Sequence, residues 1–102
     1  MNPLIDSIKS LSEEYFADVL HIRKHLHQHP ELSFEEFETS KFICQELDKI
    51  GVEYEVGIVK TGIVVLLYGK NPDSFVRMLR ADIDALPILE ANSHSYTSSI
   101  KE

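Results

Sequence analysis

The stretch that decides the fold is TGIVVLLYG, residues 61–69. Its centre, from Ile63 to Leu67, is an uninterrupted run of aliphatic residues. Such runs are typical of strands that are buried on both faces of a sheet, and in α/β proteins helices cover those faces. We therefore expect an α/β fold in which this strand is buried.

The sequence on either side predicts two further strands. Residues 52–56 alternate between apolar and charged side chains, as a half-exposed strand does. Gly57 and Gly62 bracket the short connection to the next strand, so we expect a hairpin there. A turn over the sequence NPD, residues 71–73, leads to a third predicted strand over residues 75–79.

The sequence before these strands has a helical period. Asn2 and Pro3 suit a helix start, although Ser10 with Glu13 offers a competing start, so the segment forms one helix or a short helix followed by a longer one. Pro30 ends the segment. One apolar face follows from spacings of three and four residues: Leu4, Ile8, Leu11, Tyr15, Val19, Ile22 and Leu26.

A second helix is predicted from a capping box that Ser33 and Glu36 form, and it runs to Ile50 with Gly51 as its C-cap residue. Two helices followed by three strands make an α/β layer, but two helices are too few to cover both faces of a buried sheet. We therefore expect an unfinished domain. The side chains that the second helix should bury are Phe37, Ile43, Cys44, Leu47 and Ile50.

Length and charge exclude several functions. The chain has 102 residues, enough for one domain at most, and a net charge of −7 argues against binding nucleic acid, which clustered Lys and Arg side chains hold. The single cysteine, Cys44, excludes an internal disulfide. Neither a signal peptide nor a membrane-spanning run is predicted, so we expect a cytoplasmic protein without a membrane partner.

Four histidines, His21, His25, His27 and His29, form the first candidate site. The spacing of four residues between His21, His25 and His29 could direct neighbouring imidazoles at one metal ion. The competing interpretation is a solvated surface or a helix C-terminus, where cationic side chains are favourable. The second candidate is the turn His29-Pro30-Glu31, for which a rigid corner between two helices is a sufficient explanation.

The third candidate is LRADIDALP, residues 79–87, where Asp82 and Asp84 follow the third predicted strand. Ligand sites in α/β sheets lie beyond the carboxyl ends of strands, so the two carboxylates could serve a metal ion, its histidine ligand or a water molecule. Alternatively, Asp84 caps the turn that follows, and Asp82 pairs with Arg80. The spacing alone favours neither interpretation.

Three segments carry a resemblance to a known family: IRKHLHQHPELSFEEFETSKFI, then TGIVVLLYG, then LRADIDALPILE. In this order they resemble the N-terminal part of the metal-dependent N-acyl amino acid amidohydrolases, metallopeptidase family twenty, which include hippurate hydrolase and auxin-conjugate hydrolase. The resemblance extends from about Ile22 to Glu90. It implies the N-terminal portion of an α/β/α catalytic domain with a mixed sheet, comprising two or three helices and then three strands.

The resemblance also implies a domain organisation and an activity. Residues 1–102 correspond to an incomplete catalytic domain without the inserted dimerisation domain, so a homo-oligomer is expected only at full length. Members hydrolyse the amide bond of N-acyl amino acids or related peptides, with two divalent ions (Zn, Mn, Ni or Co) sharing an activated water.

By the same resemblance, Asp84 orients a metal-bound histidine and Asp82 lies beside it, so both are candidate catalytic residues. Metal ligands come from a Cys-Gly-His segment further along the family's chain and from later residues. We therefore expect this chain to bind no metal ion by itself and to be an inactive N-terminal fragment. The alternative is a small stand-alone α/β protein that binds a partner and derives from such an enzyme.

Overall fold

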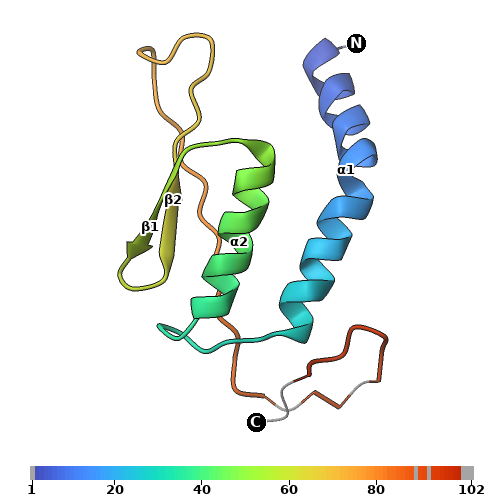
Figure 1. The fold of residues 1–102 in the computed structure, drawn as a ribbon. Coiled ribbons are helices and arrows are strands. Elements are labelled where there is room, and N and C mark those ends of the chain that lie inside the picture. The colour runs from blue at the N-terminus through green and yellow to red at the C-terminus, as the bar shows by residue number, and fades with distance from the viewer. Residues whose placement is uncertain (1, 89, 92, 100–102) are drawn as a thin grey trace. The chain divides into compact units, whose positions relative to one another are not determined.

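The computed structural model of the chain describes residues 2–88, 90–91 and 93–99. Two helices, α1 (Pro3–Gln28) and α2 (Phe37–Ile50), precede two strands, β1 (Tyr54–Ile58) and β2 (Gly62–Val65) (Figure 1). This order confirms the expected α/β arrangement. The chain divides into two compact units: one contains α1 and the described residues after 89, and the other is Pro30–Ile88.

The first unit is built on one continuous helix, so the competing start at Ser10 is not used. The Asn2 side chain accepts a hydrogen bond from the backbone N–H of Leu4 at 3.0 Å and caps the N-terminus, as Asn does well. His29 is the C-cap residue and Pro30 follows it, as predicted. Leu4, Ile8, Leu11, Tyr15 and Val19 are all exposed on the apolar face of this helix.

The predicted capping box at the start of α2 is wrong. The helix begins at Phe37, its N-cap residue Glu36 makes no side-chain capping bond, and Phe34 has a left-handed backbone with φ of 65°. The predicted end of the helix is confirmed, because Gly51 lies in the left-handed region with φ of 85° and donates its N–H to the Leu47 carbonyl at 2.9 Å.

The predicted hairpin is confirmed. Strands β1 and β2 are antiparallel, with Tyr54 opposite Val65 and Glu55 opposite Val64, and the register shifts between Val56 and Ile58. Gly62 is required at the start of β2, because a Cβ atom there would lie 2.5 Å from the Ile58 carbonyl oxygen.

The third predicted strand, residues 75–79, is not formed in the part of the chain that the structure describes. The paired sheet contains only β1 and β2, and Leu79 is 100% exposed. A strand needs a neighbour for its backbone groups, and without one this segment forms no strand. The mixed sheet that the family resemblance implied is therefore reduced here to an antiparallel pair.

The expected burial of the central strand is also wrong. Helix α2 packs against β1 within the second unit (Figure 1). Val64, Leu66 and Leu67 remain exposed. Phe37 and Ile50, two of the residues that α2 was expected to bury, are exposed as well. No described hydrophobic residue is fully buried; the buried described residues are Glu36, Thr39, Ser40 and Thr61.

None of the described helices is both long and apolar enough to cross a membrane.

The end of α2 gives the first test. Replacing Gly51 by Ala places a side chain in the left-handed region, which costs about 1 kcal/mol. No other atom lies within 4 Å of the added Cβ, so backbone conformation alone should destabilise the helix end. We expect faster amide hydrogen exchange at the C-terminus of α2 in Gly51→Ala, measured by NMR.

Gly69→Ala is the matched control, because its Cβ also meets no atom within 4 Å and its φ is not positive. Equal exchange rates in the two variants would contradict the explanation.

Candidate functional site

The two candidate catalytic acids lie in the segment after residue 75, which has no regular secondary structure, and not at the end of a strand. Asp82 pairs with Arg80, with 3.2 Å between the Arg80 Nη2 and the Asp82 Oδ1 atoms, and both side chains are largely exposed. This pair is one part of the structural interpretation that the sequence left open, whereas the turn cap that the same interpretation assigned to Asp84 is not formed with a described residue. Asp84 is exposed and makes no hydrogen bond to another described side chain or backbone group.

One hydrogen bond connects this acidic segment to the turn at His29-Pro30-Glu31. The N–H of Ala85 donates to the Glu31 carbonyl oxygen at 2.7 Å, one residue after Asp84. The two motifs, more than 50 residues apart in the sequence, therefore meet in the second unit. Their contact fixes the backbone at Asp84 and leaves its carboxylate exposed.

The Glu31 side chain performs the capping function that the sequence analysis assigned to Ser33. Its carboxylate accepts hydrogen bonds from the backbone N–H groups of Glu38, at 3.2 Å, and Thr39, at 2.5 Å. These are free amides of the first turn of α2, where a negative charge is also favourable. Because Glu31 lies outside the helix, the usual capping-box spacing gave no signal of this role.

Two opposing effects, burial and hydrogen bonding, set the pKa of Glu31. Partial burial raises the pKa of the carboxyl group, but hydrogen bonds from the side chain and backbone of Thr39 and from the backbone of Glu38 outweigh this effect. The pKa is therefore lowered from the ordinary value of 4.5. A lowered pKa means that the folded state favours the ionised carboxylate.

A second polar contact joins the start of α2 to the hairpin. Glu36 and Thr61 are only 7% and 4% exposed, and the Thr61 hydroxyl donates to the Glu36 Oε1 atom at 3.3 Å. This bond connects the start of α2 to the start of β2 and satisfies a buried carboxylate, which is costly without a partner. Both hydrogen-bonding groups of this pair are directed at each other, so we interpret the pair as structural.

The histidines do not converge on one point. The His25 and His29 rings stack with their centroids 4.4 Å apart, and His29 Nδ1 lies 2.8 Å from the His25 carbonyl oxygen. His21 is exposed. These contacts agree with a capping role at the C-terminus of α1.

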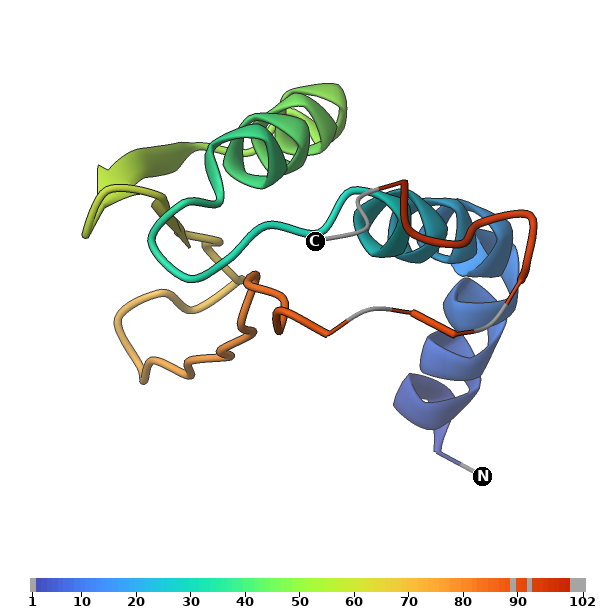
Figure 2. The same ribbon diagram turned by 90° about the horizontal axis from the view of Figure 1, so that it is seen from below.

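The remaining histidine, His27, contacts the segment near the C-terminus that follows the acidic motif. Its Nε2 atom lies 2.9 Å from the Glu90 Oε1 atom, and the Glu90 Oε2 atom accepts the N–H of Ser98 at 2.8 Å. Ser99 donates its N–H and its hydroxyl to the Gln28 carbonyl, each at 2.8 Å. These bonds hold the described residues 93–99 beside the C-terminal end of α1 (Figure 2).

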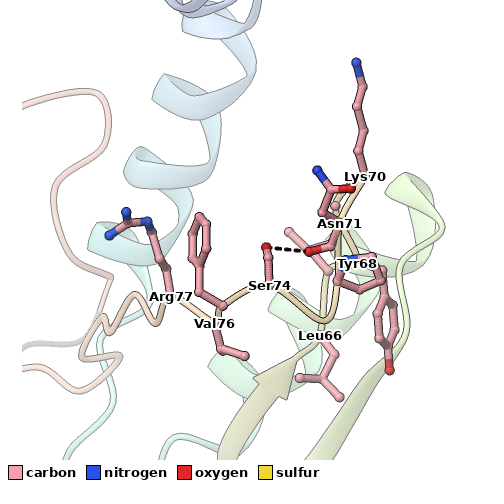
Figure 3. A pocket seen from close by; sticks show the side chains of 11 residues that line it. Leu66, Tyr68, Lys70, Asn71, Ser74, Val76 and Arg77 are labelled. Atoms are coloured by element: carbon pink, nitrogen blue, oxygen red, sulfur yellow. Dashed lines mark hydrogen bonds between the residues drawn. The ribbon is translucent and has the colours of Figure 1, made fainter.

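A hollow of about 360 Å³ lies between the end of β2 and the turn at residues 71–74 (Figure 3). Ser74 donates its hydroxyl to the Asn71 carbonyl at 2.8 Å, and the Arg77 guanidinium lies 4.9 Å from the Phe75 ring centre. The residues lining it are Leu66–Asn71, Pro72, Ser74, Phe75, Val76 and Arg77. Neither Asp82 nor Asp84 is among them, so the candidate acids do not belong to this hollow.

The described residues do not fit a metal pair. No group of three or more His, Cys, Asp or Glu side chains is arranged to hold a metal ion in residues 2–88, 90–91 and 93–99. A two-metal hydrolase centre needs several such ligands around each ion. Asp82 and Asp84 are therefore the only predicted site residues that remain candidates, and their carboxylates are exposed.

Comparison with known proteins shows what the chain is related to. An N-acyl-L-amino acid amidohydrolase of Geobacillus stearothermophilus is 41% identical over 93 residues, which is 91% of this chain and 25% of that protein. The thermostable carboxypeptidase 2 of Saccharolobus solfataricus is 36% identical over 99 residues, 96% of this chain and 25% of the relative. An uncharacterised hydrolase of Staphylococcus haemolyticus is 51% identical over 76 residues, 74% of this chain and 19% of the relative.

No family model and no solved structure gives a significant match. The fold is an α/β arrangement, and the relatives are named as hydrolases. More specifically, the chain belongs to the amidohydrolase and carboxypeptidase family that the sequence motifs indicated, and it corresponds to a fragment of it. It spans about a fifth to a quarter of the length of these relatives (19–25%).

Glu31 gives a test of helix capping and of its pH dependence. Glu31→Gln removes the charge that caps α2 and should destabilise the helix by about 1 kcal/mol, seen as lower α2 amide protection. Because the pKa is lowered on folding, the stabilisation is present above pH 4.5 and is lost as the pH falls through the pKa of the folded state. The loss of protection in acid should therefore be smaller in Glu31→Gln.

Glu35→Gln is the control, since Glu35 is exposed and its carboxylate makes no hydrogen bond or ion pair with a described residue. An acid response that is the same in Glu31→Gln and in the unchanged chain would remove Glu31 as its source.

Glu90 gives a separate test in the first unit. The N–H of Ser98, followed by the His27 side chain, lowers the pKa of Glu90 from 4.5. The contacts of Glu90 with His27 and Ser98, which we call the clasp, are therefore present above pH 4.5. They weaken as the pH falls through the pKa of the folded state. We expect hydrogen exchange at the Ser98 amide, corrected for its intrinsic pH dependence, to lose protection in acid and in Glu90→Gln at neutral pH.

His21→Gln is the matched control for His27→Gln, because His27 lies 2.9 Å from Glu90 whereas His21 is an exposed histidine of the same helix. Ser98 protection that survives in both Glu90→Gln and His27→Gln would contradict the clasp.

Proposed function

We propose that this chain forms the N-terminal part of the catalytic domain of a metal-dependent amidohydrolase that hydrolyses the amide bond of N-acyl amino acids or related peptides. The observation that carries the proposal is the 41% identity to a protein named N-acyl-L-amino acid amidohydrolase over 91% of the chain. The 36% identity to a thermostable carboxypeptidase supports the wider class, since both names describe cleavage of an amide bond next to an amino acid.

The chain by itself is inactive in this proposal. Hydrolysis with two divalent ions, Zn, Mn, Ni or Co, needs a ligand set that the described residues do not form. The remaining ligands, the inserted domain and the interface of a homo-oligomer belong to other parts of the family's chain. A small-molecule N-acyl amino acid would be the substrate of the completed enzyme, and its location would be cytoplasmic.

Asp84 and Asp82 carry different roles in the proposal. Asp84 would position a metal-bound histidine of the completed site, with Asp82 beside it. The Ala85–Glu31 hydrogen bond supports this assignment, because it holds the backbone at Asp84 against the turn that begins the second unit. A carboxylate that orients a histidine ligand typically changes metal affinity or activity by about 10–100-fold when it is removed.

The exposure of several large apolar side chains favours the interpretation that this chain is part of a larger domain over a stand-alone binding protein. Val76, Met78, Leu79 and Leu67 are exposed by 87%, 87%, 100% and 76%, and no described hydrophobic residue is buried. A self-sufficient domain of this length gains most of its stability from burying such groups.

The test is a chimera in which residues 1–99 of this chain replace the matching quarter of the Geobacillus stearothermophilus amidohydrolase. We expect hydrolysis of N-acetyl amino acids that depends on added divalent ions. Asp84→Asn should lower kcat/KM or bound metal by about 10–100-fold, and Asp82→Asn should have a smaller effect. Bound metal is measured by mass spectrometry alongside the rate.

Asp73→Asn is the control, because Asp73 lies in the distant turn after β2. A folded chimera that loads metal and hydrolyses no N-acyl amino acid would overturn the proposed activity. Unchanged metal content and rate in Asp84→Asn would overturn the role of Asp84.

A further inference from the structure

The two faces of the β1–β2 hairpin are covered unequally. Side chains that alternate along a strand share a face, and directly opposite residues of paired strands do too. Tyr54 and its partner Val65 are partly buried, on the face where the Tyr54 hydroxyl donates to the Asp48 Oδ1 atom of α2 at 2.8 Å. Glu55 and its partner Val64 point to the other face, and both are exposed.

The hydrogen bond between Tyr54 and Asp48 of α2 shifts the pKa of the tyrosine hydroxyl. The hydrogen bond to Asp48 raises the pKa of Tyr54 to about 12, with a smaller contribution from burial. The hydroxyl therefore stays protonated and remains a donor across the physiological range. Tyr54 thus marks the covered face of the hairpin, and the opposite face is the open one.

A groove of about 690 Å³ lies beside the hairpin and α2, and both faces of the hairpin contribute to it: Glu55 and Val64 come from the open face, and Tyr54 comes from the covered face. Its apolar part includes Val64 and Leu66, which are 46% and 59% exposed. Its charged residues are all carboxylates, and no lysine or arginine lines it. The residues lining the groove are Asp48, Val52, Glu53, Tyr54, Glu55, Val64 and Leu66.

The carboxylates differ in their partners. Asp48 accepts the Tyr54 hydroxyl, whereas no hydrogen bond or ion pair connects Glu53 or Glu55 to another described residue. Val64 lies directly opposite Glu55 on the paired strand, so an apolar floor lies beside the unpaired carboxylates. Such a surface matches a segment that carries apolar residues together with Lys or Arg. Electrostatic complementarity of this kind sets specificity and association rate.

The relatives indicate where such a segment comes from. The relatives continue for three to four times the length that matches this chain, since the match covers 19–25% of each. We infer that the groove binds a cationic, amphipathic segment of the remaining part of the hydrolase fold, and that this contact also forms when that part is supplied as a separate polypeptide. The inference rests on the proposed function in one respect, the identity of the partner.

The contact has two physical components. Covering the exposed parts of Val64 and Leu66 contributes through apolar burial, and this component is insensitive to moderate salt. Pairing Glu53 and Glu55 with cations contributes through charge, and salt screens this component at the surface. Binding should therefore weaken, but persist, as the salt concentration rises.

The test uses this chain and the Geobacillus stearothermophilus amidohydrolase polypeptide that lacks the quarter matching it. Association is measured by sedimentation velocity and calorimetry at low and high NaCl, with no assay of hydrolysis. We expect a one-to-one complex whose Kd rises with salt. The double variant Glu53→Lys, Glu55→Lys should raise the Kd at least about tenfold, because two attractive contacts become repulsive.

Glu13→Lys, Glu14→Lys is the matched control, because it makes the same charge change at two exposed positions of α1. It should change the Kd by less than about twofold.

Val64→Asp tests the apolar floor and should also weaken binding by about tenfold or more. Circular dichroism checks each variant for retained α2 helicity, and the salt dependence of the unchanged chain provides evidence that needs no variant.

Each contrary outcome has a definite meaning. Equal Kd values for the groove and α1 charge reversals, or a Kd independent of salt, would overturn the inference. So would self-association of this chain that the groove variants abolish, because the occupant would then be a second copy. If the covalent chimera is active but the separate parts do not associate, the proposed function stands and the groove inference is refuted. If the separate parts associate but the chimera is inactive, the groove inference stands and the proposed function is refuted.

Discussion

The second unit depends on Glu31, which forms contacts in two directions at once. Its side chain satisfies the free amides of Glu38 and Thr39 at the start of α2, and its backbone carbonyl accepts the N–H of Ala85. A helix N-terminus without such partners would leave backbone donors unsatisfied. A single residue therefore sets where α2 begins and where the acidic segment around Asp84 lies. The proline before it keeps the backbone from continuing as helix, which gives the carboxylate its position.

The interior of this unit is polar. Glu36, Thr39, Ser40 and Thr61 are the buried described residues, and Thr61 donates to Glu36. Hydrogen bonds fix geometry well but contribute only about 1 kcal/mol each to stability, so such an interior specifies a shape without supplying much free energy. The large apolar side chains that would supply it, including Leu66 and Leu79, are exposed. This division of roles fits a segment that is placed correctly by its own polar contacts and is stabilised by apolar contacts with a larger fold.

The same division explains the state of the candidate site. The backbone at Asp84 is held through Ala85, and its carboxylate makes no hydrogen bond or ion pair with another described residue. Asp82 is paired with Arg80, which is a surface contact of low energy. The chemistry proposed for the family needs ligands that converge from several segments, and the convergence of segments is a tertiary property. The relatives, of which this chain matches 19–25%, supply the length for those segments.

Local physics made much of the fold predictable from the sequence. Asn2 and Pro3 begin α1, Gly51 ends α2, and Gly62 permits the tight approach at the hairpin, because each depends on neighbours within a few residues. The motifs HPELSFEE and RADIDALP also identified the family, because they combine many specified residues. What only the tertiary structure decided involves partners distant in sequence: Glu31 and not Ser33 caps α2, His27 pairs with Glu90, and residues 75–79 remain unpaired. Periodicity predicts which face of an element is apolar, but the presence of a covering element depends on the rest of the fold.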